Sequence, residues 1–189
     1  SPKAVVLSHR NLQANRCQVL AKLHFSLDDF AFMALPLFHC FGLSGTIMMT
    51  LNGIPAFLYP SPLHYRSVPE VIYDIGATII FGTDVFLYNY ATCAHPYDFY
   101  SIRYVFASSE KLRKETTQLW LDKFGIRIFE GYGASETAPI IACNTPMHYR
   151  GGSVGRLMPK IEYYIKPING IEEGGQLFIK GPNIMLGYM

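Results

Sequence analysis

Short apolar runs alternate with longer amphipathic stretches along the first 130 residues. The apolar runs predict strands at 4–7, 31–35, 55–59, 78–81, 103–107 and 126–129. The stretches between them predict helices at 9–23, 41–51, 68–75, 84–94 and 111–124. This alternation is typical of βαβ units, so we expect an α/β fold with a mostly parallel sheet and helices on both faces.

Helix ends and faces can also be read from this part of the chain. Ser8 is a suitable N-cap for the first helix, and Gly125 is a suitable C-cap for the last. We expect the first helix to present one apolar face to the core, formed by Leu12, Cys17, Leu20 and Leu23.

After about residue 144 the pattern changes to short alternating runs separated by glycines. Strands are predicted at 160–166 and 176–180, with a turn at 170–174 between them. We therefore expect two parts, an α/β part at 1–145 and the beginning of a small antiparallel β subdomain at 146–189.

Composition excludes several classes of protein. Half of the 189 residues are hydrophobic and 16% are charged, which excludes a disordered chain. The formal net charge is +2 and no run of Lys or Arg occurs, so no nucleic-acid partner is expected. The four cysteines are scattered without a C-x-x-C pair, which indicates reduced thiols in a cytosolic setting rather than a zinc site.

Residues 38–59 carry no formal charge and reach the length of a membrane span. Asn52, Gly53 and Pro55 interrupt this stretch, so we expect a buried helix followed by a buried strand, and no membrane contact. The chain begins without a methionine and stops in an apolar context, so we expect it to be a piece of a longer protein.

The candidate chemistry is concentrated in residues 129–139, F-E-G-Y-G-A-S-E-T-A-P, which follow the last predicted parallel strand. Glycines at 131 and 133 would give left-handed backbone and a close approach to a ligand. Hydroxyls at Ser135 and Thr137 can donate to phosphate oxygens, and Glu136 can hold a hard cation such as Mg²⁺. Tyr132 offers a face for stacking on a base. The alternative is a glycine-rich turn with an exposed glutamate.

Residues 131–136 resemble the Y-G-x-S/T-E motif of the acyl-adenylate-forming enzymes, a family that includes acyl-CoA synthetases, luciferases and peptide-synthetase adenylation domains. The resemblance implies ATP and Mg²⁺ as cofactors, with Glu136 as the metal ligand. It also implies ATP or AMP binding at Gly131, Tyr132, Gly133 and Ser135.

Other motifs of that family follow in its order. Residues 1–6 resemble the end of its phosphate loop, which makes Lys3 a catalytic residue that meets pyrophosphate. Residues 35–42 resemble its L-P-x-F-H motif, which places a catalytic His39 at the acyl carboxyl group; the alternative is a buried core histidine. Residues 106–112 resemble its adenine segment, with nucleotide contacts at Ser108, Ser109 and Glu110. Residues 174–182 resemble its G-E-L-x-I/V-x-G-P motif.

The details E-K-L, E-G-Y-G and G-G-Q-L are closest to the acyl-acyl-carrier-protein synthetase half of a bacterial bifunctional 2-acylglycerophosphoethanolamine acyltransferase. This resemblance implies a fatty acid and either acyl carrier protein or CoA as partners, and a parent at the cytoplasmic face of the inner membrane. It also implies an acyl tunnel lined by Phe41, Leu43 and Met48, although packing of these side chains in the core would explain them equally well.

Two alternative functions remain: an ordinary acyl-CoA synthetase, and a non-catalytic module with a degenerate nucleotide cleft. Departures at Ala4, Ser108, Ser109 and Gln176 allow the latter.

Overall fold

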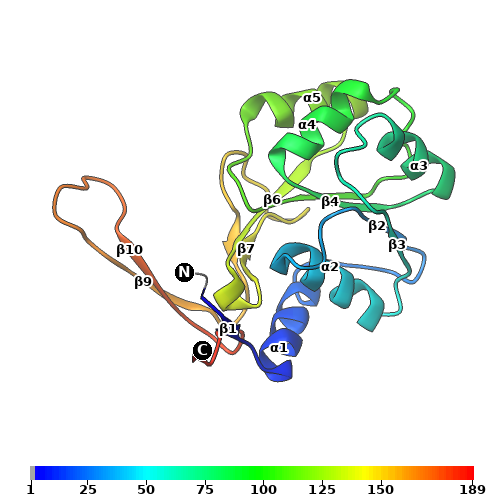
Figure 1. The fold of residues 1–189 in the computed structure, drawn as a ribbon. Coiled ribbons are helices and arrows are strands. Elements are labelled where there is room, and N and C mark those ends of the chain that lie inside the picture. Colours follow the sequence, from blue (N-terminus) through cyan, green and yellow to red (C-terminus); the bar gives the residue numbers. More distant parts are fainter. Residues whose placement is uncertain (1–2) are drawn as a thin grey trace.

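A seven-stranded sheet forms the centre of the molecule, in a computed structural model that describes residues 3–189 (Figure 1). Its strand order is β3-β2-β4-β5-β6-β7-β8. The strands from β3 to β6 are parallel, and β7 and β8 continue the sheet in antiparallel fashion. Their bounds are β2 (Ala31–Met33), β3 (Ala56–Leu58), β4 (Ile79–Gly82), β5 (Tyr104–Ala107), β6 (Ile128–Gly133), β7 (Ile140–Cys143) and β8 (Arg156–Leu157).

The inner parallel strands are buried on both faces, as the uninterrupted apolar runs predict. Every residue of β2, β4 and β5 is buried. The exception is β3, which was expected to be buried but is half-exposed to exposed, because it is the edge strand of the sheet.

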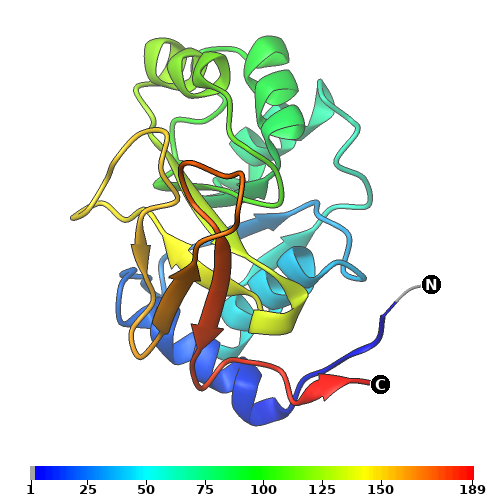
Figure 2. The ribbon, with the colours of Figure 1, turned by 90° about the vertical axis from the view of Figure 1, so that its left-hand side faces the viewer.

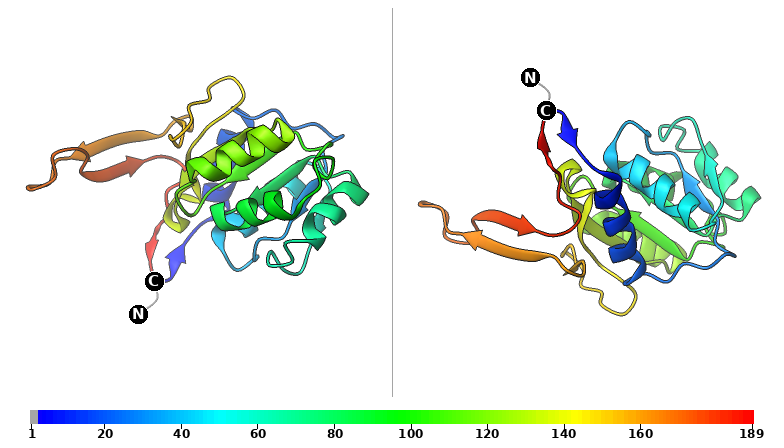
Figure 3. Two further views of the ribbon diagram at one scale, coloured as in Figure 1. Left: turned by 90° about the horizontal axis from the view of Figure 1, so that it is seen from above. Right: turned by 90° about the horizontal axis from the view of Figure 1, so that it is seen from below.

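Five helices cover the two faces of the sheet (Figure 3). On one face lie α1 (His9–Leu20) and α2 (Cys40–Leu51); on the other lie α3 (Ser67–Ile75), α4 (Asp84–Cys93) and α5 (Lys114–Phe124). The α/β fold with helices on both faces is therefore confirmed. None of the helices in the described part of the chain has the length and hydrophobicity needed to span a bilayer.

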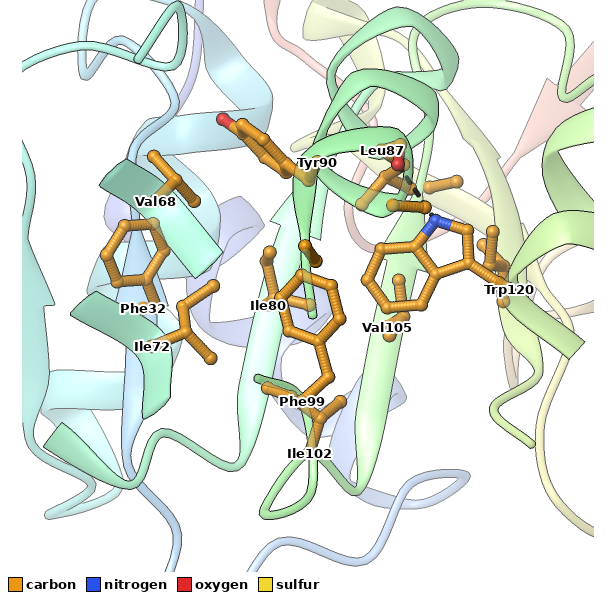
Figure 4. Close-up of a cluster of buried hydrophobic side chains, with 14 of the residues drawn as sticks. Phe32, Val68, Ile72, Ile80, Leu87, Tyr90, Phe99, Ile102, Val105 and Trp120 are labelled. Atoms are coloured by element: carbon orange, nitrogen blue, oxygen red, sulfur yellow. Dashed lines mark hydrogen bonds between the residues drawn. The ribbon is translucent and has the colours of Figure 1, made fainter. Parts of the chain in front are cut away.

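The core under α3, α4 and α5 is built around Trp120 (Figure 4). Trp120 is fully buried, stacks on Phe99 with ring centroids 4.7 Å apart, and donates from Nε1 to the Leu87 carbonyl at 2.9 Å. Such aromatic pairs contribute about 0.5–1.5 kcal/mol beyond the area they bury. These contacts fix α4 and α5 over β4 and β5, and hence the loops that follow those strands.

The first helix contradicts the expected apolar face. Its buried residues are Asn11, Asn15, Gln18 and Val19. Leu12 and Leu20 are only half-buried and Cys17 is exposed, while Leu23 is buried but lies beyond the end of the helix. Three amide side chains thus take the inner face of α1, because each finds hydrogen-bond partners there.

The C-terminal segment forms two small antiparallel pairs. The hairpin of β9 (Glu162–Lys166) and β10 (Gln176–Lys180) projects from the body in Figures 1 and 3, and it points toward the viewer in Figure 2. The strand β1 (Val5–Val6) pairs with β11 (Gly187–Tyr188), which brings the two ends of the described chain together. The antiparallel hairpin was expected; the division of the chain at residue 145 stays a prediction.

Candidate functional site

Two adjoining pockets open at the edge of the sheet where the parallel strands end, the usual ligand position in open α/β sheets. The first, about 240 Å³, is called the His39 pocket; it is lined by His39, Cys40, Phe41, Ser108, Ser109, Gly133, Ala134, Ser135, Pro139 and Ile140. The second, about 460 Å³, is called the Tyr132 pocket; it is lined by Ser108, Ser109, Glu110, Lys111, Glu130, Gly131, Tyr132, Gly133, Gly152 and Val154. The structure therefore brings together most of the site residues expected from the sequence.

The segment 108–113 begins with Ser108 and Ser109, which line both pockets, and it is a loop rather than the start of a helix. The helix was expected from Lys111, but α5 begins at Lys114 and its N-cap is Arg113. The Glu110 carboxylate accepts a hydrogen bond from the Val85 amide at 3.1 Å. Because tertiary bonds hold the backbone here, the loop keeps Ser108 and Ser109 at the pockets.

The arginine that ends this loop is bound to the first residue of α4. Asp84 accepts from the Arg113 amide at 2.9 Å and from Arg113 Nε at 2.5 Å. Burial raises the pKa of Asp84, but the hydrogen bonds from Arg113 outweigh that effect, and the pKa lies below its usual value of 3.8. The Asp84 carboxylate is therefore a charged anchor for the loop, which sequence reasoning missed.

The two glycines of the motif were expected to adopt left-handed backbone, and this was wrong. Gly131 and Gly133 lie in β6 with extended backbone. A Cβ on Gly133 would lie 2.1 Å from the Pro139 carbonyl oxygen, whereas one on Gly131 would meet nothing closer than 3.5 Å. Gly133 is thus needed for close packing of the 134–139 turn against its own strand, and Tyr132 between them is exposed at its pocket.

The turn that follows β6 separates the two hydroxyls of the motif. Ser135 lines the His39 pocket, as expected. Thr137 is buried, and its hydroxyl donates to the carbonyls of Ala134 at 2.9 Å and Pro139 at 2.5 Å. The expected phosphate contact by Thr137 was therefore wrong, because its hydroxyl closes the turn.

Glu136 is linked to both ends of the described chain. Its Oε1 accepts from the Tyr188 hydroxyl at 2.8 Å, and Lys3 Nζ lies 5.1 Å from the centre of the Tyr188 ring. The hydrogen bond from Tyr188, with a smaller effect of Lys3, holds the pKa of Glu136 below its usual value of 4.5. Ser1 and Pro2, which precede Lys3 in its motif, lie outside the described residues.

A hard cation fits this carboxylate only together with other ligands. Among residues 3–189 no group of three or more His, Cys, Asp or Glu side chains could hold a metal ion. Mg²⁺ in nucleotide sites is commonly bound by one or two carboxylates, with phosphates and waters completing its octahedron. The ionised and half-buried Glu136 fits such an arrangement.

His39 is exposed at the mouth of its pocket, so the alternative of a buried core histidine was wrong. Its Nδ1 accepts from the Phe41 amide at 3.2 Å, which makes His39 the N-cap of α2. The cap fixes the orientation of the imidazole beside Ser135 and Ser108 in the same pocket.

Behind the His39 pocket lie two narrow apolar cavities of about 30 and 20 Å³, and both are lined by Phe41 and Met48. Leu43, expected to line an acyl tunnel with them, borders neither cavity and is 42% exposed. The apolar space lies between the sheet and the two helices α1 and α2.

Comparison with known proteins identifies the family. The family model for AMP-binding enzymes matches residues 1–189. The chain is 28% identical over 201 residues to a long-chain-fatty-acid–CoA ligase of Yersinia pestis, and 27% identical over 205 residues to a 4-coumarate–CoA ligase of Pinus taeda. These alignments cover 98% and 100% of this chain but 35% and 38% of the two ligases. The chain thus spans little more than a third of the curated relatives it matches.

A solved structure agrees with the sequence relatives. ATP-bound MatB from Rhodopseudomonas palustris superimposes with a TM-score of 0.85 at 26% identity, over 98% of this chain and 38% of that chain. The resemblance to acyl-adenylate-forming enzymes is confirmed at the level of the family, whereas the closer link to a bifunctional acyltransferase stays a prediction. The chain belongs to the AMP-binding enzyme family.

Proposed function

We propose that the chain forms the nucleotide-binding part of an ATP-dependent acid–thiol ligase that activates a carboxylic acid and transfers the acyl group to coenzyme A. The observation that carries this proposal is the pair of pockets joined at Ser108, Ser109 and Gly133. One pocket offers Tyr132 as a stacking surface for a base, and the other offers His39 and Ser135 beside an apolar cavity. A nucleotide and an acid can therefore meet at the shared wall.

In the first step, a carboxylate oxygen attacks the α-phosphorus of ATP, and the bond to the bridging oxygen of the β-phosphate breaks. The products are an acyl adenylate and pyrophosphate. Chemistry at phosphorus depends mainly on positioning and charge neutralisation. In this proposal Ser135 donates to a phosphate oxygen, Tyr132 packs on the adenine, and Lys3 neutralises the departing pyrophosphate. Mg²⁺ held by Glu136 would shield the charge of the phosphates.

In the second step, a thiol that has released its proton to water attacks the acyl carbon as the thiolate, and AMP leaves with the electrons of the carbon–oxygen bond. His39 stands at the mouth of the His39 pocket, where the carboxyl group is activated, and its exposed ring suits a gate between the two steps. The apolar side chains of Phe41 and Met48 would contact the acyl chain. The division at residue 145 is part of the proposal: residues 146–189 begin the β subdomain that borders the site.

Coenzyme A is the favoured thiol because the two ligases reported above are named for it. The acceptor predicted by the closer sequence resemblance is the phosphopantetheine thiol of acyl carrier protein. Both acceptors carry the same reacting thiol, so the pockets do not distinguish them.

Fatty-acid-dependent exchange of pyrophosphate into ATP, measured on the whole protein, tests the first step. We expect exchange with a long-chain fatty acid and none without an acid. Acyl transfer is then compared with CoA and with phosphopantetheinylated acyl carrier protein as acceptors. Faster transfer to acyl carrier protein would replace CoA in the proposal. No exchange with any carboxylate, from folded protein that binds ATP, would indicate a non-catalytic nucleotide-binding module instead.

A further inference from the structure

A stripe of amide side chains on α1 is buried against the segments that carry the site. Asn11, Asn15 and Gln18 follow each other at intervals of four and three residues, which places them on one helical face. They are only 7%, 4% and 5% exposed, and Asn183 opposite them is fully buried. Amides are seldom buried without hydrogen-bond partners, so this stripe must have a structural or functional reason.

The Asn15 side chain both donates a hydrogen bond to the backbone of Ile140 and accepts one from it. Its Nδ2 donates to the Ile140 carbonyl at 2.7 Å, and its Oδ1 accepts from the Ile140 amide at 3.2 Å. Asn183 holds the other side of the turn, because its Nδ2 donates to the Thr137 carbonyl at 2.6 Å. The Met185 amide donates to the carbonyl of Glu136 at 2.9 Å. Residues outside the turn therefore bind the backbone at Glu136 and Thr137 and again at Ile140.

The remaining amides join these two anchors into one network. Gln18 accepts from Asn15 Nδ2 at 3.1 Å and donates to Asn183 Oδ1 at 3.3 Å and to the Pro159 carbonyl at 2.8 Å. Asn11 donates to the carbonyls of Pro182 at 3.0 Å and Ile184 at 2.8 Å, which flank Asn183. The turn, α1 and the segment 182–185 are therefore coupled through buried hydrogen bonds.

The turn itself has an uncommon backbone that needs such support. Ala138 adopts left-handed backbone with φ of 63°, which residues other than glycine rarely do. Such conformations persist where the surrounding structure over-determines them. The anchors on Thr137 and Ile140 flank Ala138 on both sides, and the side chains of Ser135 and Glu136 lie on the same turn.

We propose that Asn15 and Asn183 are positioning residues for the adenylation step. They hold the backbone of residues 136–140 so that Ser135 and Glu136 keep the direction needed to meet the phosphates and their cation. This inference rests on the proposed function, because it assigns those two side chains to the nucleotide. Asn183 is not expected to touch substrate. Asn15 also borders the apolar cavity of about 30 Å³, but its proposed role is exerted through its two hydrogen bonds to the Ile140 backbone.

The test compares Asn15→Leu and Asn183→Ser with the wild type in the whole protein. We expect kcat for pyrophosphate exchange to fall by about 10- to 100-fold, the usual cost of losing an outer partner of a metal-binding side chain. The Mg²⁺ concentration for half-maximal exchange should rise, while the KM for ATP changes at most by a factor of about three because the Tyr132 pocket is untouched. If Asn15→Leu does not fold, Asn183→Ser carries the test, since a smaller polar side chain leaves room for water beside Gln18.

A matched control removes a similar bond far from the site. The Thr78 hydroxyl accepts a hydrogen bond from the Phe30 amide at 2.9 Å and donates one to Asp29 at 2.8 Å. These residues lie just before β4 and β2, at the amino ends of the parallel strands and thus away from the site. Thr78→Val should lower stability without changing kcat or the Mg²⁺ dependence. A loss of kcat in Thr78→Val equal to that in Asn15→Leu would overturn the proposal, because the effect would then be one of stability alone.

Two further readouts separate positioning from stability. In hydrogen exchange without nucleotide, the amides of Ala134 and Thr137, which bond only within the turn, should exchange faster in Asn15→Leu than in Thr78→Val. In a double-mutant cycle, Asn15→Leu should cost much less activity in the Glu136→Gln background, since both changes disable the same side chain. Additive effects of the two substitutions on activity, with unchanged hydrogen exchange of the turn amides, would overturn the proposal. Absence of pyrophosphate exchange in the wild type would instead refute the proposed function.

Discussion

The Asp84 carboxylate binds both the backbone amide and the guanidinium of Arg113, and so ties the start of α4 to the end of the loop that separates the two pockets. Asp84 is buried, whereas the Arg113 side chain is half-exposed. Asp84→Asn should lower the free energy of unfolding by about 1.5–3 kcal/mol, the range for a lost hydrogen bond to a charged group. Chemical denaturation measures the change, and the loosened loop should also weaken ATP binding.

The same pair predicts how stability depends on pH. The pKa of Asp84 in the folded protein lies below its usual value of 3.8, so the ionised form favours folding. This contribution is complete above pH 3.8 and is lost as the pH falls through the lower pKa of the folded state. Below pH 3.8, the wild type should therefore lose stability faster than Asp84→Asn. Parallel curves for the two proteins would contradict the assignment.

Gly131 and Gly133 form a matched pair of sites for alanine. In Gly133→Ala the new Cβ would clash with the Pro139 carbonyl oxygen, so the turn carrying Ser135 and Glu136 must move. In Gly131→Ala the nearest atom is an ordinary contact away. We expect Gly133→Ala to lower ATP affinity by about tenfold or more, as small misplacements in such sites do, and Gly131→Ala to change it little. Equal losses of ATP affinity in the two variants, measured by isothermal titration, would show that steric packing does not explain the need for glycine at Gly133.

His39 has two roles that different substitutions separate. Because His39 is the N-cap of α2, His39→Ala should lower the free energy of unfolding by about 1 kcal/mol. His39→Asn supplies another capping oxygen and should restore most of that stability. Both variants lack the imidazole, so both should lose acyl transfer if the ring acts at the carboxyl group. Full activity of His39→Asn would limit His39 to capping.

Much of the fold follows from the sequence because local and tertiary preferences agree. Each buried parallel strand is an apolar run, and each helix on the α4–α5 face carries an apolar stripe that packs on the sheet. The position of the site also follows, since residues after neighbouring parallel strands must share one edge. The strands β7 and β8 were missed, although the apolar run I-I-A-C at 140–143 is a visible signal for β7.

The failures of prediction have specific physical causes. Helical patterns are normally interpreted with the apolar face inward, but α1 buries its amides because backbone groups at 140, 159 and 182–184 need donors and an acceptor. Sequence near Lys111 favours a helix, but Asp84 binds the Arg113 backbone and delays its start. A glycine in a motif indicates either left-handed backbone or a close contact, and the packing of the folded chain decides which of the two applies.

Glu136→Gln keeps the shape of the side chain and removes its charge. Because the carboxylate is half-buried and accepts its hydrogen bond from the exposed Tyr188, the change should alter the free energy of unfolding by less than about 0.5 kcal/mol. Loss of the metal-binding charge should lower pyrophosphate exchange by about 100-fold. Unchanged exchange with a normal Mg²⁺ dependence would remove Glu136 from the metal site.

Tyr188→Phe isolates the hydrogen bond that orients Glu136. Phenylalanine keeps the ring beside Lys3 and removes only the hydroxyl that donates to Glu136 Oε1. Because a free carboxylate samples more rotamers, the Mg²⁺ concentration for half-maximal ATP binding should rise by up to about tenfold. Tyr163→Phe, on the projecting β9–β10 hairpin, is the matched control and should leave this value unchanged. Tighter binding in Tyr188→Phe would mean that the hydroxyl competes with the cation, so that Tyr188 must release Glu136 before the nucleotide binds.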